Sequence, residues 1–192
     1  MGGPFGQAAV FLIDTLFWLY ILAVLLRFLF QLVRADFYNP FSQALVAITN
    51  PTLLPLRRMI PSLYGIDFAA LVLVLVLQVV KNVLLGLIIG QWYNLLGLIV
   101  YSAAELLQMT VYLFIFLIFI RVLLSWVAPY GGHNPVTGLL FSVTEPLMRP
   151  ARRLIPPLSG LDLSPVAVFI LLYLTLILIV TPLLSVSKSL LV

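Results

Sequence analysis

A 19-residue segment occurs twice in this chain, and its repetition limits the folds that are available. Residues 49–67, TNPTLLPLRRMIPSLYGID, align with residues 144–162, TEPLMRPARRLIPPLSGLD, at a constant offset of 95 and with identity at 10 of 19 positions. Leu, Ile, Val and Phe dominate the sequence on either side of each copy. A repeat of this kind indicates a fold assembled from two copies of one unit. The sequence therefore predicts two similar halves, each built around one polar loop.

The amino-acid composition places the chain in the membrane class. Of its 192 residues, 64% are hydrophobic and 8% are charged, whereas a typical soluble domain has about 25% charged residues. The absence of Cys excludes disulfides and thiolate metal sites. We also expect no cofactor, because neither a nucleophile elbow, a phosphate loop nor a paired acidic cluster occurs. The prediction is a non-enzymatic membrane protein that does not bind nucleic acid, since it has no basic helix.

Four apolar segments are long enough to cross a hydrocarbon core of ~30 Å, which takes about 20 helical residues. They lie near 8–33, 68–90, 104–128 and 165–186. The first has no basic region before it, and we interpret it as a permanent span, not a cleaved signal. Residues 91–103 leave two alternatives: an interfacial linker or part of a fifth crossing. The predicted organisation is a first repeat at 1–90, the linker at 91–103 and a second repeat at 104–192.

The distribution of Lys and Arg favours four crossings. Both repeat loops are basic, whereas the N-terminal tail and residues 91–103 contain neither Lys nor Arg. Short basic loops remain cytoplasmic, so both loops should lie inside the cell and both termini outside. The predicted fold is thus an all-α membrane protein of four transmembrane helices, arranged as two hairpins that cross the membrane in the same sense.

Each loop should contain an amphipathic segment broken by proline. Asn39-Pro40 and Asn134-Pro135 are suited to begin helices. Three prolines in each copy should prevent one continuous helix: Pro51, Pro55 and Pro61, and Pro146, Pro150 and Pro156. The segments should lie in the membrane interface, and Asp67 and Asp162 should cap the spans that follow.

The repeated pattern NP…T-x-P-x-x-x-P-x-R-R-x-I-P-x-L-x-G-x-D resembles the YggT family of small bacterial and plastid membrane proteins, over nearly the whole chain. The resemblance implies a multi-pass protein of the bacterial inner membrane. Members of the family have been linked to cell division and nucleoid organisation, to assembly of a plastid cytochrome, and to ion balance under osmotic stress. The first copy departs from the pattern at Asn50, where the second has Glu145, and at Ala69-Ala70, where the second has Ser164-Pro165.

The arginine pairs Arg57-Arg58 and Arg152-Arg153 have two interpretations. They either anchor the topology or form a docking surface for anionic lipid headgroups or an unidentified membrane or cytoplasmic protein. The recurrence of both pairs within the same proline frame motivates the second interpretation.

Six charged residues within or beside the spans suggest intramembrane pairing. Arg27 and Arg121 recur at an offset of 94, and Asp67 and Asp162 at 95, so we expect the pairs Arg27–Asp67 and Arg121–Asp162. The alternative for each arginine is snorkelling to the headgroups. Asp14 and Lys81 lie at similar depths in their spans and are expected to form an ion pair that sets helix register, with a conduction site as the alternative. Gln78 and Asn82 are expected to add polar contacts between helices.

Two functions remain. The sparse polarity within the spans favours a scaffold or assembly factor for cell division, the envelope or a membrane complex. The alternative is a component of ion transport or osmotic-stress homeostasis, acting as a homo-oligomer with Asp14 and Lys81 along its path.

Overall fold

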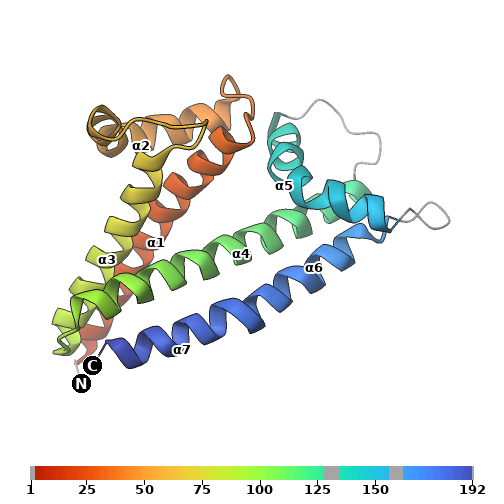
Figure 1. Cartoon of the computed structure of the whole chain (residues 1–192). Helices are drawn as coiled ribbons and strands as arrows, with labels where there is room; N and C mark the ends of the chain where they lie inside the picture. The colour runs from red at the N-terminus through yellow and green to blue at the C-terminus, as the bar shows by residue number, and fades with distance from the viewer. Residues whose placement is uncertain (1–2, 128–134, 156–161, 192) are drawn as a thin grey trace.

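A computed structural model describes residues 3–127, 135–155 and 162–191. Over these residues the chain is helical and its elements follow one another with short connections (Figure 1). The elements are α1 Pro4–Leu32, α2 Pro40–Met59, α3 Phe68–Ile89, α4 Leu95–Val127, α5 Pro135–Leu154, α6 Ser164–Thr175, the π-helical turn η1 Leu176–Val180, and α7 Thr181–Leu190.

Four of these helices are long and apolar enough to cross a membrane: Pro4–Leu32, Phe68–Ile89, Leu95–Trp126 and the continuous segment Ser164–Leu190 formed by α6, η1 and α7. The prediction of a multi-pass, all-helical membrane protein agrees with this result. The π-helical turn precedes Pro182, whose missing N–H cannot complete a regular α-helical ladder, and the Thr181 hydroxyl bonds the Leu176 carbonyl over 2.9 Å.

The third span begins earlier than the sequence predicted. α3 ends at Ile89 and is followed by Gly90, whose φ of 72° forms a left-handed cap. The Asn94 side chain accepts the backbone amide of Leu96 at 2.9 Å. Residues 95–103, predicted as linker, are instead the first turns of α4. With 33 residues, this helix is about 50 Å long, which is longer than the ~30 Å hydrocarbon core of a bilayer. In the described ranges, no fifth crossing occurs between α3 and α4.

The spans pack as two pairs that meet near the chain termini. α1 lies beside α3, and α4 lies beside the α6–η1–α7 segment, with α3 against α4 where the pairs meet (Figure 1). The pairs diverge toward the opposite end, where α2 and α5 lie across the helix ends. Ile21, Val24 and Leu53 form the buried core where α1, α2 and α3 meet, and Ile118, Met148 and Val168 form its counterpart among α4, α5 and α6.

The contact between α4 and the C-terminal end of the chain depends on Gly97. A Cβ atom at this position would lie 2.2 Å from the Leu190 carbonyl oxygen. The Asn94 amide also donates to the Leu191 carbonyl at 3.1 Å. Backbone approaches this close require a residue without a side chain, so Gly97 sets the spacing between the two segments.

The predicted proline breaks are wrong for four of the six prolines. α2 continues through Pro51 and Pro55, and α5 continues through Pro146 and Pro150. All four are exposed, and each pair has i, i+4 spacing, so the carbonyls that lose a donor lie on one outward stripe where water or headgroups can satisfy them. α2 ends just before Pro61, as predicted, whereas Pro156 lies outside the described residues.

Candidate functional site

Each span pair contains a cluster of arginines and acceptors at the end that carries α2 or α5. We define the first cluster as Arg27, Gln31, Thr49, Arg57 and Asp67. Arg27, on α1, is 5% exposed and donates through Nη1 to the Thr49 hydroxyl at 2.6 Å and the Val46 carbonyl at 3.4 Å. Arg57, in the last turn of α2, donates through Nε to Asp67 at 3.0 Å and through Nη2 to Gln31 at 2.8 Å. This cluster fastens α2 to both spans of its pair.

The second cluster consists of Arg121, Thr144, Glu145, Arg152 and Asp162. Arg121, on α4, is 4% exposed; it donates to the Thr144 hydroxyl at 2.7 Å and to Glu145 at 2.8 Å. The guanidinium also lies 4.1 Å from the centroid of the Phe141 ring. Arg152 reaches Glu145 at 3.2 Å and Asp162 at 3.1 Å. Glu145 therefore bridges two arginines.

The predicted pairs Arg27–Asp67 and Arg121–Asp162 are wrong as direct ion pairs. Asp67 binds Arg57, and Asp162 binds Arg152. In the first copy, the chain leaves α2 and reverses through Gly65, whose φ is 82°, and this turn returns Asp67 to the last turn of α2. The aspartate consequently meets the arginine ten residues before it and not the arginine on the neighbouring span.

The capping prediction is confirmed for Asn39 and Asp67 and is wrong for Asp162, because the N-cap of α6 is Leu163 and Asp162 lies one residue before it. Asn39 accepts the Phe41 amide at 2.9 Å, and Asp67 accepts the Ala70 amide at 3.2 Å. Asp162 accepts the Ser164 amide at 2.9 Å. Burial raises the pKa of the Asp162 carboxyl, but hydrogen bonds from Ser164 and Arg152 outweigh that effect, and the net pKa lies below its usual range. Asn134 and Gly160 lie outside the described residues.

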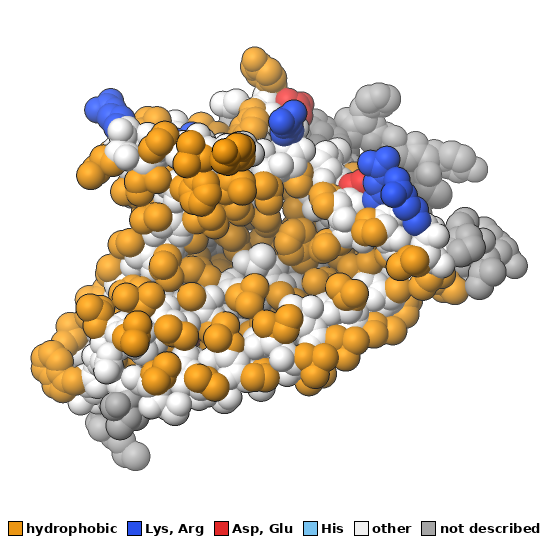
Figure 2. Space-filling model, viewed as in Figure 1, with side chains coloured by type: hydrophobic (Ala, Val, Ile, Leu, Met, Phe, Trp, Pro, Cys, Tyr) orange, Lys and Arg blue, Asp and Glu red, His pale blue; other side chains and the backbone are white. Residues whose placement is uncertain are grey.

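The second arginine of each repeated pair is oriented differently from the first. Arg58 and Arg153 are exposed, and within the described ranges neither has an ion pair or hydrogen bond. Arg149 is also exposed. Figure 2 shows Lys and Arg side chains on the α2 and α5 end of the molecule, whereas hydrophobic side chains cover the sides of the spans. The structure thus separates two roles that the sequence could not: Arg57 and Arg152 hold the loops, and Arg58 and Arg153 face outward.

The predicted contact between Asp14 and Lys81 is confirmed. The Lys81 Nζ lies 3.3 Å from Asp14 Oδ1 and connects α1 with α3. The Lys81 side chain is buried and that of Asp14 is about half exposed. The pair therefore keeps a buried ammonium group next to a counterion in the apolar part of the molecule.

A second polar group within the spans contains Gln78 and Asn82, which form the interhelical polar contacts expected of them, but its centre, Glu105, was not predicted. Glu105 Oε2 accepts from Gln78 at 2.8 Å and from Asn82 at 2.7 Å, and Asn82 also donates to Ser102 at 3.0 Å. These bonds join α3 to α4 and hence one span pair to the other. The sequence contains an indication of this group, because Glu105 is an isolated acidic residue in an apolar run. It was missed because a third span that starts at residue 104 would place Glu105 at the membrane surface.

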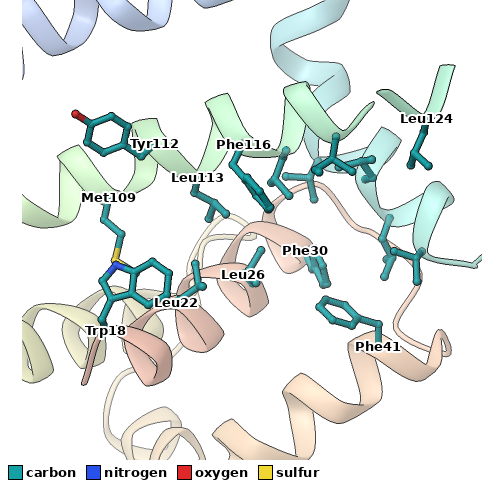
Figure 3. A pocket seen from close by; sticks show the side chains of 16 residues that line it. Trp18, Leu22, Leu26, Phe30, Phe41, Met109, Tyr112, Leu113, Phe116 and Leu124 are labelled. Atoms are coloured by element: carbon teal, nitrogen blue, oxygen red, sulfur yellow. The ribbon is translucent and has the colours of Figure 1, made fainter. Parts of the chain in front are cut away.

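An apolar groove lies between the diverging span pairs. Its volume is about 700 Å³, and its walls come from α1, α4, α5 and Phe41 of α2. Figure 3 shows Leu22, Leu26 and Phe30 facing Met109, Leu113 and Phe116 across it. Its lining is almost entirely hydrophobic, so the groove supplies no convergent polar groups of the kind that conduct ions.

Comparison with known proteins identifies the family. The CCB3/YggT sequence profile matches two segments, residues 6–88 and 100–183. An uncharacterised protein of Pseudomonas aeruginosa is 45% identical over 86% of this chain and 84% of its own length. One from Vibrio alginolyticus is 43% identical over 83% of this chain and 86% of its own. The Escherichia coli protein named uncharacterised protein YggT is 37% identical over 85% and 84%, respectively.

No solved structure matches the chain. The profile matches cover both repeats and together most of the chain, and each of these three relatives is similar over more than four-fifths of both sequences. The chain therefore belongs to the CCB3/YggT family.

Proposed function

We propose that this protein is a non-enzymatic scaffold or assembly factor of the bacterial inner membrane, in which both basic loops face the cytoplasm and recruit an acidic partner. The observation that carries the proposal is that the two arginines of each pair have different surroundings. Arg57 and Arg152 are held by ion pairs with Asp67 and Asp162. Arg58 and Arg153 are exposed beside them, at matching positions of the two copies.

The arrangement of the arginines favours a docking surface over a role in membrane topology alone. Charge bias requires only that basic residues lie in the correct loop. Here two continuous amphipathic helices, α2 and α5, carry the exposed arginines, and Asp67 and Asp162 fasten the ends of those helices. Because the exposed arginines are carried on helices that are already fastened, less conformational entropy is lost when a partner binds.

Crosslinking in cells tests the proposal. Met59 and Leu154 follow the exposed arginines and are themselves 81% and 82% exposed, so a photoreactive residue at either position samples the docking surface without replacing it. We expect adducts from both positions that disappear after Arg58→Gln and Arg153→Gln. Trp92, exposed at the opposite end of the molecule, is the matched control. Adducts that are insensitive to the arginine changes, or identical to those from position 92, would contradict the proposal.

A role in ion transport is the second candidate, and the polar residues within the spans favour it. Asp14–Lys81 and the Glu105 group connect α1, α3 and α4. These groups pair and hydrogen-bond mainly with one another, as expected for residues that hold helices together. The scaffold is therefore the preferred function. Ion flux through purified protein in liposomes distinguishes the candidates: a selective flux that Lys81→Met abolishes would replace the scaffold with a transporter.

A further inference from the structure

The buried arginine has different hydrogen-bond partners in the two copies. In the second, Arg121 bonds Thr144 through one terminal nitrogen and Glu145 through the other. In the first, Arg27 bonds Thr49 in the same manner, but the residue that follows is Asn50 instead of glutamate. Within the described ranges, Arg27 makes no hydrogen bond to Asn50, and its buried Nε has no partner.

This difference leaves the two clusters with unequal charge. The second contains two arginines with two carboxylates, and Glu145 lies between the guanidinium groups. The first contains two arginines with Asp67 alone, a net charge of +1. Arg27 is subject to repulsion from Arg57 as well as attraction to Asp67. A buried cation without a full counter-charge is costly, so the first cluster is electrostatically suited to an additional anion.

Part of the first cluster lies at the protein surface, through Asn50 and Arg57, whereas Arg27 is buried. The Glu145 side chain, which marks the equivalent location in the second copy, is 40% exposed. Asn50 is partly buried, and Arg57 is also partly exposed. Arg27 lies five residues from the end of α1, about 7.5 Å along the helix axis, which corresponds to the headgroup and acyl boundary.

We propose that the first cluster binds an anionic lipid, whose phosphodiester takes the place beside Asn50 that the Glu145 carboxylate takes in the second copy. The phosphate oxygens would accept charge-assisted hydrogen bonds from Arg27 and Arg57, for which the planar guanidinium is well suited. A single negative charge would balance the cluster. Leu54, exposed on α2 four residues after Asn50 and therefore on the same face of the helix, provides apolar contact for an acyl chain. This inference goes beyond the proposed function, because it does not require any partner at Arg58 or Arg153.

The duplication provides matched variants for the test. Asn50→Glu builds the carboxylate of the second copy into the first, and Glu145→Gln removes it from the second. Purified full-length protein is titrated with phosphatidylglycerol in detergent, with phosphatidylcholine as the neutral reference, and retained lipid is counted by native mass spectrometry. We expect one phosphatidylglycerol to be retained by the wild type and by the uncharged control Asn50→Gln. Affinity should fall at least tenfold in Asn50→Glu, whereas Glu145→Gln should retain a second lipid.

Equal retention of phosphatidylglycerol by the wild type and Asn50→Glu would overturn the proposal. If Asn50→Glu did not fold, failure of Glu145→Gln to gain a lipid would overturn it as well. Soluble glycerophosphate distinguishes the source of the anion. We expect millimolar glycerophosphate to leave the lipid in place; its binding in preference to lipid, with the same dependence on Asn50, would assign the site to a free phosphate and reject the lipid.

Discussion

The Nε of Arg57 donates to the carboxylate of Asp67 over 3.0 Å and joins the last turn of α2 to the start of α3. Its counterpart in the second copy, Arg152 to Asp162, has nearly the same length, 3.1 Å. The environments differ, however: the Asp67 side chain is 1% exposed and that of Asp162 is 43% exposed. The two equivalent bonds should therefore contribute unequally to the stability of the two halves.

We expect Arg57→Gln to destabilise the protein far more than Arg152→Gln. Loss of Arg57 leaves the buried Asp67 carboxylate without its cation, a change that costs on the order of 3 kcal/mol. The ion pairs of Arg152 are partly exposed, and their loss should cost less than about 1 kcal/mol. Thermal unfolding of both variants in the same detergent measures the difference. Equal shifts in the unfolding temperature would show that burial of Asp67 does not govern the strength of its pair.

The Asp14–Lys81 pair should behave as a charge-compensating unit. Asp14→Asn alone leaves a buried ammonium group in an apolar span, for which roughly 3 kcal/mol is expected. The double variant Asp14→Asn with Lys81→Met removes both charges and should recover most of that stability. The measurement is again unfolding in detergent, together with the amount of protein inserted in membranes. A double variant no more stable than Asp14→Asn would mean that the 3.3 Å contact does not compensate Lys81.

Gly97→Ala should separate α4 from the C-terminal end of the chain. The added methyl group would meet the Leu190 backbone at 2.2 Å, and such overpacking typically costs about 1–3 kcal/mol. Gly138→Ala in α5 is the matched control, because nothing lies within 4 Å of its added Cβ and alanine favours a helix by up to ~1 kcal/mol. The two variants should therefore shift the unfolding temperature in opposite directions; shifts of the same sign would be inconsistent with a close approach at Gly97.

The absence of Cys from the chain permits a direct test of topology. Single cysteines at positions 59, 154 and 92 replace exposed side chains at the two ends of the molecule. With both basic loops in the cytoplasm, a membrane-impermeant maleimide should label position 92 in intact spheroplasts and label positions 59 and 154 only after permeabilisation. Labelling of 59 and 154 from opposite sides would reject a parallel arrangement of the two copies.

Much of the architecture could be predicted because it depends on local patterns. Runs of apolar residues identify helices that can cross a membrane, and the number of such helices in the described structure agrees with the prediction. The Asn39 and Asp67 caps were also predictable, because a capping side chain contacts backbone amides only two or three residues away. The Asp14–Lys81 contact could be predicted from depth in the membrane alone, since the two residues are unrepeated charges at similar depths in their spans.

The continuous course of α2 through Pro51 and Pro55 was not predictable by the same reasoning. Proline removes a hydrogen bond and is expected to end a helix, but the cost depends on whether the affected carbonyls face solvent or the protein interior. Only the packing of α2 on its span pair decides that both prolines point outward. The depth of Glu105 was missed for a related reason, because the start of α4 is set by the turn at Gly90 and not by hydropathy.

The membrane class, the duplication, the four candidate spans and the gathering of the arginines at one end of the molecule could all be predicted, since they follow from composition and from the order of residues along the chain. Tertiary structure decided which arginine binds which carboxylate. Asp67 binds Arg57 and not Arg27 of the same cluster, because the turn at Gly65 returns the aspartate to the last turn of α2. The same geometry places Glu145 between two arginines while Asn50 leaves Arg27 without a carboxylate in the first copy.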